Sequence, residues 1–173
     1  MTPADLLRDA FSRLPEVVHA AVDGLTDDDL TVRLDADANS VAWLVWHLAR
    51  VQDDHVAAAF GSDESWETDG WRERFALPDD VTGIGYGHTR AQVGAVRASA
   101  DVLTGYYDAV HARTLQLVST VTAGDLDRVV DRSWDPPVTL GVRLTSVLQD
   151  VLEHAGQAAF VRGVLERRGR PQD

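Results

Sequence analysis

Three side chains that can bind a metal ion or move a proton fall on two predicted helices. His47 lies within the apolar stripe of one helix, between Leu44 and Val51, so it points towards the interior. His154 occupies the same kind of position in a later helix, and Asp150 precedes it by four residues. That spacing stacks the carboxylate and the imidazole one helical turn apart. The pattern predicts two imidazoles and one carboxylate that converge in an apolar core.

This set of side chains is typical of a divalent metal site. A buried carboxylate is costly unless it is paired or bound to a metal. Two imidazoles and a carboxylate suit a borderline ion such as zinc or nickel, and leave positions open for water or substrate. A second interpretation stays open, in which His47 is a hydrogen-bonded core residue and Asp150 pairs only with His154.

Five further residues are candidates for the pocket or for supporting the ligands. His55 and Asp54, at eight and seven residues after His47, fall on roughly the same side of that helix. Trp43 could form a wall of the cavity or simply pack in the core. Gln157 could line the pocket or orient a ligand. Arg162, two turns beyond His154, could meet an anionic group at the rim or form a surface salt bridge.

Two other groups of residues lack the neighbouring residues that a functional site would need. Gly83–Gly87 reads GIGYG, but it lacks the preceding strand and the following lysine of a phosphate loop, so we expect a flexible loop. His19, His88 and His111 have no partner at metal-binding spacing, and we expect them at the surface or in packing contacts.

Four amphipathic segments predict the elements that position these side chains. Apolar residues recur at spacings of three and four, with capping residues before the segments and glycine after the first two. A long irregular connection, residues 61–98, separates the second and third helices, and residues 133–137 form an extended crossover with no convincing strand pattern. The fold class is therefore all-α, a four-helix bundle in one domain over residues 1–173. The four helices are expected at 3–22, 40–60, 99–121 and 140–168.

The amino-acid composition excludes several kinds of chemistry and argues against several kinds of partner. The chain has no cysteine, which excludes disulfides, thiolate ligands and a cysteine nucleophile. A formal net charge of −12 argues against nucleic acid and anionic membrane surfaces as partners. No apolar run reaches the roughly 18 residues that span a bilayer. We expect a soluble, cytoplasmic protein.

Two segments carry a resemblance to a known family. SVAWLVWHLARVQDDH at 40–55 and LTSVLQDVLEHAGQAAFVRG at 144–163 resemble the DinB-like (YfiT-like) superfamily. More narrowly, they are similar to its branch near the mycothiol-dependent maleylpyruvate isomerase and related thiol transferases. The resemblance implies a four-helix bundle, a homodimer, and a divalent metal held by His47, His154 and the residue at position 150. That residue is histidine or glutamate in the family and the shorter aspartate here.

The resemblance also implies a reaction. A low-molecular-weight thiol such as mycothiol would be transferred to a small electrophilic substrate, or would assist its isomerisation. Because the chain has no cysteine, the thiol must come from a cosubstrate. Two alternatives remain open: a metal-dependent hydrolase on the same site, and a non-catalytic stress-response bundle.

Overall fold

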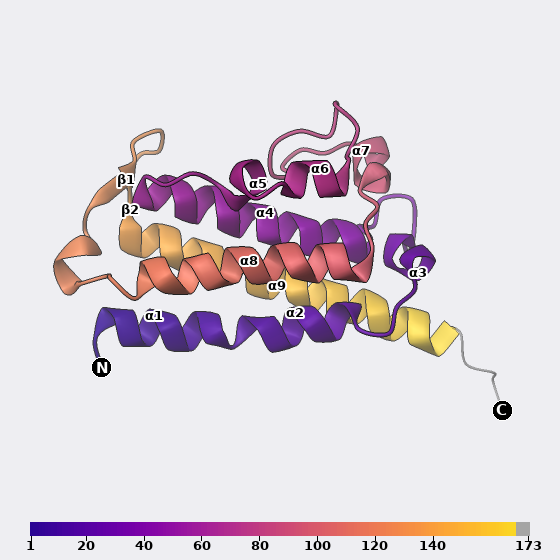
Figure 1. Cartoon of the computed structure of the whole chain (residues 1–173), viewed down its shortest axis with the longest axis horizontal. Helices are drawn as coiled ribbons and strands as arrows, with labels where there is room; N and C mark the ends of the chain where they lie inside the picture. The colour runs from indigo at the N-terminus through magenta and orange to yellow at the C-terminus, as the bar shows by residue number, and fades with distance from the viewer. Residues whose placement is uncertain (169–173) are drawn as a thin grey trace.

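Four long helical rods form the body of the protein in a computed structural model that describes residues 1–168 (Figure 1). The first rod consists of two helices lying end to end, and the other three are single helices. This arrangement confirms the all-α class. The rods are α1 (Pro3–Ser12) with α2 (Leu14–Val22), α4 (Val41–Phe60), α8 (Ala100–Val118) and α9 (Leu140–Arg168).

Local capping sets the ends of α4 and α8. The Ser40 hydroxyl accepts a hydrogen bond from the Trp43 amide at 3.1 Å, and Gly61 ends α4 in the left-handed conformation at φ 66°. Ser99 caps the start of α8 in the same way. Helix α8 ends at Val118, three residues before the predicted end at 121, in a turn closed by the Val121 amide and the Val118 carbonyl.

The prediction of one continuous helix over residues 3–22 was wrong. Pro15 is the second residue of α2 and has no amide hydrogen to donate to the carbonyl of Phe11. The Arg13 amide bonds that carbonyl instead, so the helix breaks at Arg13 while the rod keeps its direction.

The long connection contains short helices that lie along the α4 edge of the bundle, away from α1 and α2 (Figure 1). The connection was expected to be irregular, and these three short helices interrupt it. They are α5 (Ser65–Thr68), α6 (Trp71–Phe75) and α7 (Arg90–Ala95). Another short helix, α3 (Asp27–Thr31), follows the first rod.

A small hairpin replaces the expected strand-free crossover. Strands β1 (Val129–Asp131) and β2 (Val138–Thr139) pair antiparallel, with Val129 opposite Thr139. Three strand residues and two are too few for the alternation that identifies a strand from sequence. The turn between them begins where Asp131 accepts the Ser133 amide at 2.8 Å.

Helix α4 is the centre of the core. It is buried on almost every side and packs most extensively against α9 and then α8. A side chain on α4 that points towards α9 is therefore shielded from solvent, which is the environment that the site requires. Within residues 1–168, no helix combines the length and the apolar character needed to cross a membrane.

Candidate metal centre

Helices α4 and α9 bring His47, Asp150 and His154 together. One ligand atom from each of the three residues lies within 4.8 Å of the other two. His47 is buried, and the other two side chains are 15% and 18% exposed. His47 therefore lies on the buried side of the cluster, and solutes can approach the cluster from the side of Asp150 and His154.

Both imidazoles are fixed by hydrogen bonds to backbone carbonyls. His154 Nδ1 lies 2.8 Å from the Asp150 carbonyl, one turn earlier in α9, and His47 Nδ1 contacts the carbonyl of Ile84. A carbonyl can only accept, so Nδ1 of each ring carries the hydrogen. The neutral rings are left with free lone pairs on Nε2, which is the arrangement that metal-binding histidines need.

Charge and burial act differently on the two imidazoles. Burial lowers the pKa of His47 and favours its neutral form. The Asp150 carboxylate, whose Oδ2 lies 3.3 Å from His154 Nδ1, raises the pKa of His154. The carboxylate therefore stands beside the imidazole that is easier to protonate.

The carboxylate of Asp150 is incompletely satisfied. Its Oδ2 is buried and has no hydrogen-bond donor among residues 1–168, although His154 Nδ1 lies 3.3 Å away. An unsatisfied buried carboxylate oxygen is costly, and a cation would remove that cost. The donor set and this orphaned oxygen fit a divalent ion.

The segment Gly83–Gly87 forms the remaining wall of the cluster. Gly85 has φ +107°, and a Cβ added there would lie 2.6 Å from His47 Nδ1 and 3.0 Å from Trp43 Cζ2. Only glycine lets the backbone approach this closely, so the loop can place the Ile84 carbonyl on His47. Sequence reasoning missed Ile84, Gly85 and Tyr86, because GIGYG was compared only with phosphate loops. The alternation of glycines was the available signal.

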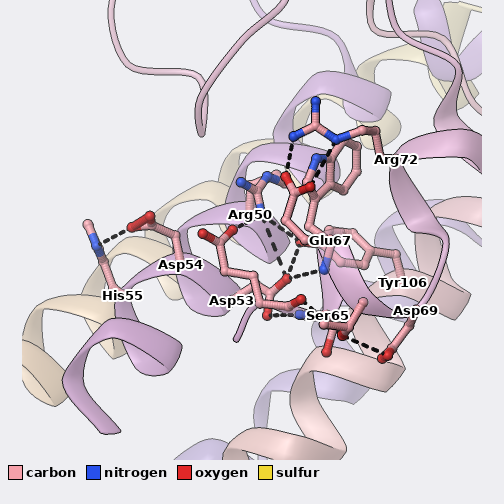
Figure 2. Close-up of polar contacts among 12 residues, drawn as sticks. Arg50, Asp53, Asp54, His55, Ser65, Glu67, Asp69, Arg72 and Tyr106 are labelled. Atoms are coloured by element: carbon pink, nitrogen blue, oxygen red, sulfur yellow. Dashed lines mark hydrogen bonds and ion pairs between the residues drawn. The ribbon is translucent and has the colours of Figure 1, made fainter. Parts of the chain in front are cut away.

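Of the five other candidates, Trp43 alone contacts the cluster. Its indole stacks on the His47 ring with centroids 4.6 Å apart and planes at 14°. Its Nε1 donates to His88 Nδ1 at 3.2 Å, so His88 is a packing residue. Asp54 and His55 pair with each other at 3.0 Å, apart from the Arg50–Asp53–Tyr106 contacts (Figure 2). That pairing lowers the pKa of Asp54.

Gln157 and Arg162 have other surroundings. Gln157 is exposed and lines a groove with Leu44 and Phe160. Arg162 donates to Glu166 at 2.8 Å and to the carbonyl of Ala20. The contacts described for both side chains are therefore with residues other than the three clustered ones.

A cavity of about 420 Å³ lies beside the same loop. Gly83 and Ile84 line it together with Arg50, Trp66 and Arg72. Arg50 pairs with Glu64 at 2.7 Å and lies over the Trp66 ring. Arg72 pairs with Glu67 (Figure 2). The cavity is thus polar, with both charge signs and an aromatic wall, and its size suits a small molecule.

Substituting Gly85 tests whether the loop supports the cluster. We expect Gly85→Ala to weaken zinc binding about 10- to 100-fold, the usual cost of losing a group that orients a ligand. The added methyl group would push the Ile84 carbonyl off His47. Gly87→Ala is the matched control, because it has a similar positive φ of +73° with nothing within 4 Å of the added carbon. Equal zinc affinity in the two variants, measured by competition with a chelator, would contradict the role of Gly85.

The chain is similar to proteins of known sequence and structure. Residues 6–167 match the family described as mycothiol-S-transferase. A conserved protein from Enterococcus faecalis, known from a crystal structure, is 31% identical, with a TM-score of 0.85. The likeness covers 94% of this chain and 96% of that one. No curated protein matches the chain.

Proposed function

The chain belongs to the mycothiol-S-transferase family, and we propose that it joins a low-molecular-weight thiol to a small electrophile at a divalent metal centre. The observation that carries this proposal is the convergence of His47, Asp150 and His154, with a buried carboxylate oxygen that lacks a donor among the described residues. Zinc or nickel is the ion that two imidazoles and a carboxylate favour.

The residues of the chain have defined tasks in this reaction. A bound divalent ion would act as a Lewis acid that lowers the pKa of a thiol at its open position. His47 and His154 would hold the ion through Nε2, because their Nδ1 atoms are engaged by carbonyls. Trp43 covers one face of His47 and keeps water from it. Since the chain has no cysteine, no internal thiol competes with the cosubstrate.

We propose that the polar cavity beside the loop receives the substrate or the non-reacting part of the thiol. It shares Ile84 with the environment of His47, which supports a location next to the reacting atoms. Its arginine and carboxylate pairs offer both donors and acceptors to a hydroxyl-rich or amide-containing ligand.

Removal of the metal tests the function directly. Protein loaded with zinc should convert mycothiol and 1-chloro-2,4-dinitrobenzene to the S-conjugate, with chloride as the leaving group. Chelator-treated protein should return to the uncatalysed rate, and zinc should restore activity. Turnover without any thiol would favour a hydrolase, and the same rate with and without metal would exclude a metal-dependent transferase.

We also propose that two copies pair through the exposed face of α9. Leu152 and Phe160 are 52% and 63% exposed, and they lie on one side of the helix with Gly156 between them. The groove beside Phe160, of about 440 Å³, is lined by Leu44, Gly156 and Val161 and offers space for the partner's aromatic ring. The mass of the protein in solution, from sedimentation equilibrium, decides between one copy and two.

A further inference from the structure

Tyr86 contacts the clustered side chains of His47 and Asp150 from a loop outside the four long helices. It is the fourth of the five residues in the Gly83–Gly87 loop and is 65% exposed, so burial alone does not hold it in place. Nevertheless its ring meets the His47 ring edge to face, with centroids 5.4 Å apart and planes at 81°. Its hydroxyl lies 3.5 Å from Asp150 Oδ1. The loop therefore contacts one ligand with its backbone and a second ligand with a side chain.

The two oxygens of Asp150 have different surroundings. Oδ1 faces the hydroxyl of Tyr86, whereas Oδ2 is buried and lacks a hydrogen-bond donor among residues 1–168. A carboxylate can bind an ion through one oxygen or through both. A donor held against one oxygen favours binding through the other. Groups that fix a ligand in this way affect metal affinity nearly as much as the ligands themselves.

We propose that Tyr86 is a positioning residue whose hydroxyl holds Asp150 Oδ1, so that the carboxylate presents a single oxygen to the ion. This inference rests on the proposed metal centre. Tyr86 acts through Asp150 and needs no contact with the substrate. Because the side chain is 65% exposed, the position of the Tyr86 hydroxyl depends on the conformation of the Gly83–Gly87 loop.

The Tyr86→Phe variant separates the hydroxyl from the ring. Phenylalanine keeps the edge-to-face contact with His47 and the glycines around it, so the Ile84 carbonyl stays in place. Tyr107→Phe is the matched control, because the Tyr107 hydroxyl is buried on α8 and has no partner among the described residues. Each protein would be titrated with Co²⁺ in competition with a chelator, and its visible absorption spectrum recorded.

We expect Tyr86→Phe to bind Co²⁺ about tenfold more weakly than wild type. The weaker, broader absorption of a higher coordination number should also appear, since both carboxylate oxygens become free to bind. Tyr107→Phe should match wild type in both measurements. Wild-type affinity and spectrum in Tyr86→Phe would overturn the role of Tyr86 and leave the metal centre standing. Failure of the wild-type protein to bind Co²⁺ or Zn²⁺ would overturn the metal centre itself, and this inference with it.

Discussion

Replacing His154 by alanine is expected to weaken zinc binding by two to three powers of ten. Zinc sites with four protein ligands contribute about 10–16 kcal/mol, so one ligand accounts for about 2.5–4 kcal/mol. Each factor of ten in affinity corresponds to about 1.4 kcal/mol. His47→Ala should have an effect of the same size, because its imidazole would supply the other nitrogen ligand of the proposed centre. Competition with a chelator of known affinity measures both changes.

His55→Ala provides the control for these substitutions. His55 lies on the same helix as His47, but it pairs with Asp54 and is outside the cluster of three. Its loss should leave the zinc affinity unchanged. If the His47 and His154 variants retained wild-type metal content, no metal site could be assigned to α4 and α9.

Asp53→Ala is expected to lower the free energy of unfolding by about 3–5 kcal/mol, as when one partner of a buried charged group is removed. The Asp53 carboxylate is buried and accepts the amides of Ser65 and Trp66 at 2.9 and 2.8 Å. It also accepts the Tyr106 hydroxyl at 2.9 Å, with the Arg50 guanidinium 3.7 Å away (Figure 2). One side chain thus ties α4 to α5 and α8.

The neighbouring Asp54→Ala isolates the effect of burial. Its side chain is 33% exposed and pairs with His55, so its loss should cost less than about 1 kcal/mol. Urea unfolding at constant m-value compares the two variants. Similar unfolding midpoints would show that the contacts of Asp53 contribute little. The loss of about 3–5 kcal/mol expected for Asp53→Ala is large, because the total free energy of unfolding of a domain is only about 5–15 kcal/mol.

The long helices could be predicted because each carries its own signals. Ser40 and Gly61 bracket α4, and the expected segment 140–168 coincides with α9. The pairing of His47 with His154 followed from the same periodicity, since both lie on interior stripes of helices that face each other. Asp150 followed from its spacing to His154.

Contacts that join distant segments could not be read in this way. Nothing near residue 47 in the sequence indicates that Ile84, 37 positions away, places its carbonyl on His47. The break at Arg13 was predictable in principle from Pro15, but the continuous apolar stripe outweighed it. The β1–β2 hairpin is stabilised by a turn and by the Asp131–Arg143 ion pair at 2.7 Å, and not by a strand pattern.

The two carbonyls that accept hydrogen bonds from the imidazoles differ in how easily each contact would be lost. The His154 anchor lies one turn away in its own helix and persists as long as α9 does. The His47 anchor belongs to a surface connection, and such segments open locally at a lower free energy than the global unfolding of the domain. Loss of a bound ion would then depend on local opening of residues 83–87, with the four-helix bundle intact. By mass action, a bound ion makes that opening rarer, so amide exchange in this short stretch would slow with metal while that of the bundle core stays the same.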